Sequence, residues 1–162
     1  VGKKNHEAVS GAMTQALAEA EALRARLLEL VEADVAAFGQ VMAAYGLPKA
    51  SDEQQQVRSA AIQVALKGAT DVPLECARAC SEVIRVCRAV AEQGNRNVIS
   101  DAGVAVAAAQ AALRSAALNV YVNTGVIRDA GFVASRLAEL ERLTADSGDE
   151  TDAIYQIVRD RL

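Results

Sequence analysis

Asp34 is the residue whose type and position most suggest acid–base chemistry. Apolar residues recur around it every three or four positions, from Leu27 through Phe38 to Tyr45, which predicts that it shares the buried line of a helix. A carboxylate on such a line must be paired with a cation or hold its proton more tightly than in water. Two interpretations remain open: a structural aspartate that bends the helix or forms a salt bridge, and a partly desolvated general base or acid.

A second polar set is expected on one face of another helix. Asp101 and Asn119 are 18 residues apart, which is five helical turns, and Asn123 follows one turn later. The same face carries small residues, namely Ala105, Ala108, Ala112 and Ser115. We therefore expect another element to pack closely on this face and the polar groups to line a groove. The alternative is that both asparagines bond to a neighbouring helix and Asp101 caps its own.

Several kinds of site are absent from the sequence. There is no Walker loop, no dinucleotide fingerprint and no pair of cysteines at zinc-binding spacing, and the only histidine is His6. No metal site is therefore expected, and catalysis would depend on carboxylates, amides, lysines and hydroxyls. The three cysteines, Cys76, Cys80 and Cys87, are an odd number at helical spacings, which is typical of buried reduced thiols.

Composition predicts a bundle of closely packed helices. Of the 162 residues, 52% are hydrophobic but only 3% are aromatic, so alanine, valine, leucine and isoleucine must form the core. The length suits one domain over residues 1–162. The net charge of −4 and the scattered basic residues argue against nucleic-acid binding. No window looks apolar enough for a membrane span and the start does not resemble a signal peptide, so we expect a cytoplasmic protein.

Helical periodicity and its interruptions divide the chain into elements. Gly46 and Pro48 end the first helix, Ser51 begins the second, and Pro73 is expected to separate the second from a third. Ser100 or Asp101 is placed to cap the next helix. The predicted helices cover about residues 6–45, 51–70, 73–93, 101–126, 131–144 and, after a break at 146–149, the rest of the chain to 162. The fold class is therefore all-α, a bundle of five or six helices with long antiparallel members.

Segments that periodicity does not explain resemble the formimidoyltetrahydrofolate cyclodeaminase and methenyltetrahydrofolate cyclohydrolase family. They match in order and separation between about residues 2 and 129. These segments are 32–38 (EADVAAF), 47–49 (LPK), 72–74 (VPL), 94–105 (GNRNVISDAGVA) and 118–123 (LNVYVN). The Gly-Asn-x-Asn-x-x-Ser-Asp-Ala-Gly run that begins at Gly94 is the most specific of them.

The resemblance implies an α-helical homodimer that acts on a one-carbon derivative of tetrahydrofolate, without a metal or tightly bound cofactor. It places the family's catalytic aspartate on Asp34, and Asp101 is a second catalytic candidate that could orient it or the pterin. The candidate substrate-binding residues are Lys3, Lys4, Lys49, Asn97, Ser100, Asn119 and Asn123. For the lysines, ordinary solvation at chain ends and turns is the alternative.

Two reactions share this pocket in the family: hydrolysis of 5,10-methenyltetrahydrofolate to 10-formyltetrahydrofolate, and cyclising deamination of 5-formiminotetrahydrofolate with release of ammonia. The alternative is a non-catalytic helical protein that binds folate or dimerises. The family also begins with a helix opened by Pro-Gly-Gly-Gly-Ser, which does not precede Gly2 here. We therefore expect the 162 residues to lack that helix.

Overall fold

The computed structural model describes the backbone of residues 3–162 and the side chains of residues 9–162. Within this range there are five α-helices, one 3-10 helix and no strand, so the predicted all-α class is confirmed. The elements are α1 (Lys3–Tyr45), α2 (Asp52–Gln93), η1 (Arg96–Val98), α3 (Ile99–Thr124), α4 (Ala130–Thr144) and α5 (Ser147–Arg161).

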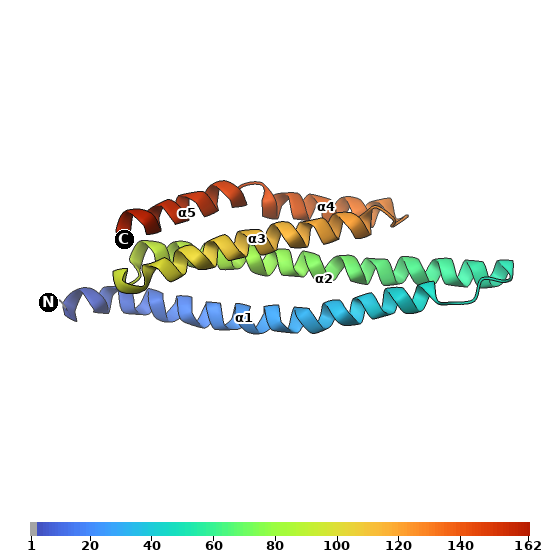
Figure 1. Ribbon diagram of the computed structural model, residues 1–162, viewed down its shortest axis with the longest axis horizontal. Helices are drawn as coiled ribbons and strands as arrows, with labels where there is room; N and C mark the ends of the chain where they lie inside the picture. The colour runs from blue at the N-terminus through green and yellow to red at the C-terminus, as the bar shows by residue number, and fades with distance from the viewer. Residues whose placement is uncertain (1–2) are drawn as a thin grey trace.

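The molecule is an elongated bundle built around α2 (Figure 1). Helix α1 runs along most of the molecule, α2 returns antiparallel to it, and α3 runs back along α2. The short helices α4 and α5 follow one another along the outer side of α3. Helix α2 packs against α1, α3, α4 and α5, whereas α1 packs extensively only against α2. Helices α1 and α3 therefore both pack on α2 and make little contact with each other.

Turn chemistry explains the ends of α1 and the start of α2. The N–H of Gly46 donates to the carbonyl of Met42 at 3.0 Å, which closes α1, and the Ser51 hydroxyl accepts from the N–H of Gln54 at 3.2 Å. Both predictions are confirmed. The prediction that Ser100 or Asp101 caps the following helix is wrong, because α3 begins at Ile99 and its N-cap, Val98, makes no side-chain capping bond.

Pro73 lies inside α2 and does not end it, so the predicted break at residues 71–73 is wrong. Proline lacks the N–H that would bond to the carbonyl of residue 69. The structure supplies a substitute donor, because the amide nitrogen Nδ2 of Asn123 on α3 lies 2.7 Å from the carbonyl oxygen of Ala69. Periodicity along one helix could not reveal a donor that comes from another.

The core consists of small and branched aliphatic side chains, as composition predicted. Its largest fully buried members come from α2, α3, α4 and α5, and they include Leu74, Ile84, Val106, Leu113, Leu140 and Ile154. Cys80 and Cys87 lie among them as free thiols, and Cys76 is half-buried. Helix α1 adds mainly alanines and Leu23 to the edge of this core.

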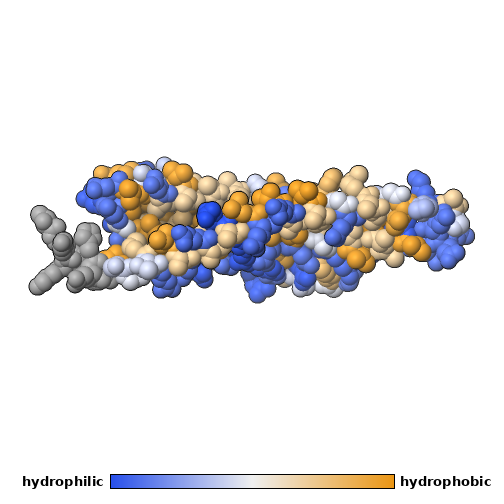
Figure 2. Space-filling view, turned by 90° about the horizontal axis from the view of Figure 1, so that it is seen from below, coloured by the Kyte–Doolittle hydropathy of each residue, from blue (hydrophilic) through white to orange (hydrophobic). Residues whose placement is uncertain are grey.

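Helix α1 has a narrow buried stripe and a broad exposed apolar face. The buried residues lie seven or fourteen positions apart: Ala16, Leu23, Ala37 and Ala44. A second set alternates at spacings of three and four and is 45–69% exposed; we call it the α1 seam, and it comprises Leu28, Val31, Val35, Phe38, Met42 and Tyr45. Figure 2 looks onto the molecule from the side of α1 and shows hydrophobic side chains at the surface along it. This spacing is that of a helix that packs against another helix.

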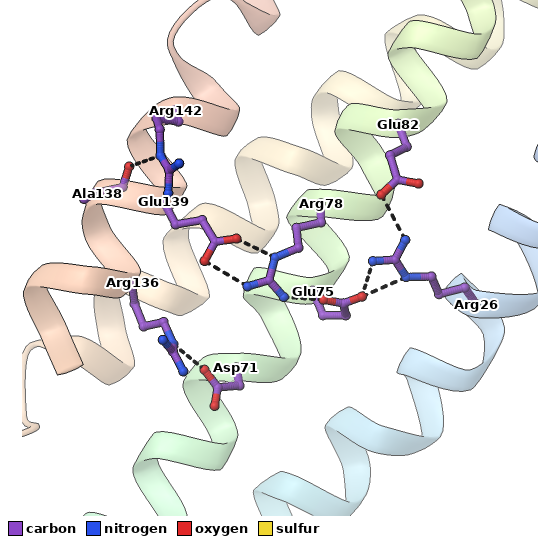
Figure 3. Close-up of polar contacts among 9 residues, drawn as sticks. All are labelled: Arg26, Asp71, Glu75, Arg78, Glu82, Arg136, Ala138, Glu139 and Arg142. Atoms are coloured by element: carbon purple, nitrogen blue, oxygen red, sulfur yellow. Dashed lines mark hydrogen bonds and ion pairs between the residues drawn. The ribbon is translucent and has the colours of Figure 1, made fainter.

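An ionic network fixes α1 and α4 on α2 (Figure 3). Arg26 of α1 donates to Glu75, and its other branch reaches Glu82 at 3.0 Å. Arg78 bonds to Glu75 and grips both oxygens of Glu139 on α4 at 2.6 and 2.9 Å. Burial opposes ionisation of Glu75, but the two arginines outweigh it and lower its pKa. The bonds from Arg78 lower the pKa of Glu139 as well.

The segment Arg96–Thr124 is long and apolar enough to cross a membrane by length and composition, with a mean hydropathy of 1.2. This contradicts the prediction that no window reaches that level. The core helix of a globular protein passes the same test, and α3 does pack against α2, α4 and α5.

The bond across Pro73 can be tested with a double-mutant cycle. We expect Asn123→Ala to lower the free energy of unfolding by about 1–2 kcal/mol, because the Ala69 carbonyl loses its donor. In a Pro73→Ala background residue 73 regains its N–H, so the same change should cost clearly less. Urea unfolding of the four proteins measures both values. An equal cost in both backgrounds would contradict this role of Asn123.

The ionic network predicts a loss of stability in acid. Glu75 and Glu139 have lowered pKa values in the folded state, so their contribution is present above the usual glutamate value of about 4.5 and is lost as the pH falls through the folded values. We expect Glu139→Gln to lower the free energy of unfolding by about 1 kcal/mol at pH 7 and by less at pH 3. Glu29→Gln, on the exposed side of α1, is the matched control. A penalty for Glu139→Gln that does not change with pH would contradict the account.

Candidate active site

A groove runs between α1 and α3, with α2 as its floor. We call its central part the Asp34 groove; it encloses about 410 Å³. Its polar lining comes from opposite walls, with Asp34 on α1 and Ser115 and Asn119 on α3. The apolar lining includes Val31, Val35, Val72, Pro73, Cys76 and Ala112. The structure thus brings together three polar residues that the sequence analysis had placed on two different helices.

Asp34 lies at the border between the buried stripe of α1 and the α1 seam. It is in register with Leu27 and Val41, seven residues away on either side and both half-buried. Val31 and Phe38, which flank it on the predicted buried line, are 62% and 63% exposed. Asp34 is itself exposed, so the predicted burial is wrong for the single chain. It lines the groove without being enclosed by it.

The face of α3 that carries small residues is open. Ala105, Ala108, Ala112 and Ser115 are all exposed, so the prediction that another element packs closely on them is wrong within this chain. The Ser115 hydroxyl donates to the carbonyl of Ala111 at 2.8 Å. The Asn119 amide makes only a long contact, 3.4 Å, to the carbonyl of Ser115. Both side chains therefore keep acceptor capacity toward the groove.

Asp101 lines a neighbouring hollow, the Asp101 hollow, which encloses about 590 Å³ between α1, α2 and α3. This hollow is mostly apolar and shares Leu27 and Val31 with the Asp34 groove. Ser115 lies 14 residues further along α3 than Asp101, a rise of about 21 Å. Asp101 therefore cannot orient Asp34 of the same chain, although the two hollows join end to end.

The remaining predicted residues lie at opposite ends of the bundle. Lys49 is in the turn between α1 and α2, whereas Asn97 and Ser100 follow the other end of α2. Since α2 has 42 residues, about 60 Å separates the two ends. Ser100 lines a small hollow between α3 and α5, away from Asp34. The side chains of Lys3 and Lys4 lie outside the described residues.

Asn123 forms a hydrogen bond to a neighbouring helix, which is the alternative interpretation that the sequence analysis left open. Its amide donates to Ala69 across Pro73, next to the Asp34 groove. A role toward a ligand remains a prediction and would involve the amide oxygen or the second N–H of the amide.

Two features of the site were not predicted from the sequence. Lys49 shares a hollow with Arg58 and Arg128, and this basic hollow lies beyond Asn123 from the Asp34 groove. Arg58 bonds to the Tyr45 carbonyl and Arg128 to the Ser59 hydroxyl, which holds both guanidinium groups in place. The other feature is Cys76 in the wall of the Asp34 groove. A row of residues on one face of α2, spaced three and four apart, runs from the basic hollow to the Asp34 groove. These are residues 55, 59, 62, 66, 69, 73 and 76.

The chemistry available in the Asp34 groove is proton transfer by a carboxylate beside an apolar floor. A hydroxyl and an amide on the opposite wall can orient a flat ligand through its polar edge. Within residues 9–162 no three His, Cys, Asp or Glu side chains come close enough together to hold a metal ion.

Comparisons with known proteins identify the family and the fold. The sequence model of the formiminotransferase-cyclodeaminase family matches residues 1–142. A methenyltetrahydrofolate cyclohydrolase of Methylorubrum extorquens is 52% identical over all 162 residues, which cover 78% of that protein. The formimidoyltransferase-cyclodeaminase of Sus scrofa is 30% identical over 99% of this chain and 29% of its own length. The crystal structure of formiminotetrahydrofolate cyclodeaminase from Thermotoga maritima superposes with a TM-score of 0.78 at 31% identity, over 99% of this chain and 74% of that one.

Proposed function

Because the chain belongs to the formiminotransferase-cyclodeaminase family, we propose that it is an enzyme of one-carbon tetrahydrofolate metabolism that hydrolyses 5,10-methenyltetrahydrofolate to 10-formyltetrahydrofolate. The placement of Asp34 opposite Ser115 and Asn119 carries this proposal, because it offers one acid–base group beside a surface for a flat ligand. The identity of 52% to a methenyltetrahydrofolate cyclohydrolase over the whole chain supports the choice of reaction.

Asp34 acts as the general base in the proposed mechanism. A water molecule attacks the methenyl carbon between N5 and N10, and the carboxylate takes a proton from that water. The carbon–N5 bond then breaks as the new hydroxyl loses its remaining proton to solvent and becomes the formyl oxygen, and the protonated Asp34 returns a proton to N5. The negative charge of Asp34 also stabilises the cationic methenyl ring before attack. The amide of Asn119 orients the substrate from the opposite wall of the groove.

Cyclodeamination is the second candidate activity, and the match to the Thermotoga maritima cyclodeaminase favours it. In that reaction N10 attacks the formimino carbon and ammonia leaves, so Asp34 again removes one proton and delivers one. Methenyl hydrolysis followed by absorbance, and ammonia release from 5-formiminotetrahydrofolate, measured on the same preparation, separate the two. Folate binding without either activity would instead support the non-catalytic alternative.

The basic hollow is the proposed place for the acidic tail of the substrate. Within one chain, Lys49, Arg58 and Arg128 line it without a carboxylate among its lining residues. Asn123 lies between the basic hollow and the Asp34 groove. Ala116, which lines the groove, lies seven residues before Asn123 on α3. A ligand with its reacting carbon at Asp34 can therefore extend a glutamate carboxylate toward these cations. No tightly bound cofactor is required by this arrangement.

We further propose that the protein is a homodimer in which α1 seams pack together. The seam has the alternating spacing of a coiled-coil interface and borders the Asp34 groove through Val31 and Val35. Only a second helix over this face would enclose Asp34. The three free cysteines support a reducing compartment, so a cytoplasmic location is part of the same proposal.

Antiparallel pairing of the two α1 seams would bring predicted site residues of one subunit close to those of the other. Two-fold pairing about the centre of the seam sets Leu28 of one subunit opposite Tyr45 of the other. Leu28 lines the Asp101 hollow and Tyr45 lines the basic hollow. Asp101 of one subunit would then face Lys49 of the other, although they lie far apart in one chain. Parallel pairing would leave them separated.

Asp34→Asn tests the catalytic assignment. We expect the rate of methenyltetrahydrofolate hydrolysis to fall at least about 100-fold, because the amide cannot accept the proton. The fold should persist, since Asp34 is exposed. Asp152→Asn, an exposed aspartate on α5, is the matched control and should leave the rate unchanged. Unchanged turnover in Asp34→Asn would remove Asp34 from the mechanism.

Phe38→Glu tests the dimer. A charge in the middle of the seam should be costly to bury, so sedimentation analysis should show a monomer with little activity. Val64→Glu places the same charge on an apolar side chain of α2 that is 73% exposed outside the seam, and it should remain dimeric. A dimeric Phe38→Glu protein, or a monomeric wild type, would contradict the proposal.

A further inference from the structure

Helix α3 carries a second exposed apolar line, which the pairing of α1 seams described above does not account for. Only two residues of Ile99–Thr124 are charged, Asp101 and Arg114. On the side of α3 that faces away from α2, apolar and small residues alternate at spacings of four and three. We call this line the α3 seam, and it comprises Val104, Ala108, Ala111, Ser115, Leu118 and Val122. All six are exposed, so nothing in residues 9–162 covers the seam.

An apolar helix with one open side needs a partner on that side. The opposite side of α3 is buried against α2 and α5, through residues that include Val106, Leu113 and Val120. On the open side, Leu118 and Val122 are 66% and 71% exposed. A helix that is apolar all round is normally buried all round, and an exposed apolar face marks a contact with another surface. The α3 seam is therefore expected to be covered in the assembled protein.

The Asp34 groove fixes the level of α3 beside α1. Asp34 and Val35 of α1 line the groove together with Ser115 and Asn119 of α3. The two helices run in the same direction, because both are antiparallel to α2 (Figure 1). The centre of the α1 seam, between Val35 and Phe38, lies about 4 Å beyond Asp34 along the helix axis.

The same step along α3 leads to its most exposed apolar pair near the groove. About 4 Å beyond the level midway between Ser115 and Asn119 lies the point between Leu118 and Val122. A two-fold axis through the centre of the α1 seam, at right angles to both helices, therefore also passes between Leu118 and Val122. The register of the α1 seam was set without reference to α3, so this agreement is an independent observation.

We propose that the α3 seam packs on the α3 seam of a second copy, about the same two-fold axis that relates the α1 seams. This inference rests on the homodimer of the proposed function. Antiparallel pairing sets Leu118 of one subunit opposite Val122 of the other, and it does so twice. One step outward, Ser115 lies opposite Val126, which is 55% exposed. Neither charged residue of α3 is part of the seam.

Paired α3 seams complete the enclosure of the Asp34 groove. Paired α1 seams cover one wall of the groove, and paired α3 seams cover the other, so the grooves of the two subunits face each other across the axis. Asp34, which is exposed in the single chain, then lies in a space bounded by α1, α3 and the same two helices of the partner. A flat ligand in this space is held from both sides.

Val104 is the matched internal control. It belongs to the α3 seam and is 71% exposed, like Val122. It lies about 24 Å before the proposed axis along α3, and the level opposite it lies beyond the end of the partner's α3. The proposed pairing therefore leaves Val104 uncovered. Pairing of the α3 seams about their own midpoint would instead set Val104 opposite Val122.

The test is sedimentation analysis of Leu118→Glu and Val104→Glu beside the wild type. Leu118→Glu places a carboxylate next to the axis twice, which is costly to bury, so this variant should be a monomer with little activity. Val104→Glu should remain dimeric and active. Both side chains are exposed in the single chain, so both variants should keep the helical circular dichroism of the wild type. A dimeric Leu118→Glu protein, or dissociation by Val104→Glu, would overturn the proposal.

Two further variants keep the α3 contact separate from the dimer on which it rests. Monomeric Phe38→Glu together with dimeric Leu118→Glu would leave the α1 contact standing and remove the α3 contact, whereas a monomeric wild type would contradict both. Leu118→Ala adds no charge and should raise the dimer dissociation constant at least about tenfold. A dissociation constant equal to that of the wild type would contradict the α3 contact.

Discussion

The hydrogen bond from Asn123 to the carbonyl of Ala69 is the interaction on which the candidate site depends. It replaces the backbone bond that Pro73 cannot make, so α2 continues through the proline as one helix. It also ties α3 to α2 beside the floor of the Asp34 groove. If α2 broke at Pro73, α1 and α3 would no longer pack on one continuous helix.

The groove exists because α1 and α3 both pack on α2 and hardly touch each other. The ionic network through Arg26 and Glu75 fixes α1 from one side, and the aliphatic core fixes α3 from the other. Small residues on the facing side of α3 leave the space between the walls open. Asp34, Ser115 and Asn119 line that space from opposite sides, which suits a flat ligand that needs a proton moved at its centre.

The sequence predicted the fold class, most helix boundaries and the polar residues Asp34 and Asn119 that line the Asp34 groove. Asp34 and Asn119 were found because each is a polar residue on a line of apolar or small ones. The continuity of α2 was missed because the bond that permits it comes from a residue 50 positions beyond Pro73. The exposure of Val31 and Phe38 was missed for a different reason: an apolar period predicts that a face is covered, and it does not say whether the same chain or another covers it.

The central proposal is that one elongated site spans two subunits, with Asp34 and Lys49 from one chain and Asp101, which faces that Lys49, from the other. Hybrid dimers of an Asp34→Asn subunit and an Asp101→Asn subunit, purified through two different tags, test it most directly. A shared site leaves one of the two sites intact in each hybrid, so about half of the wild-type activity should return although each variant homodimer is inactive. Hybrids as inactive as the two homodimers would contradict the account, because they would place both aspartates in the site of a single chain.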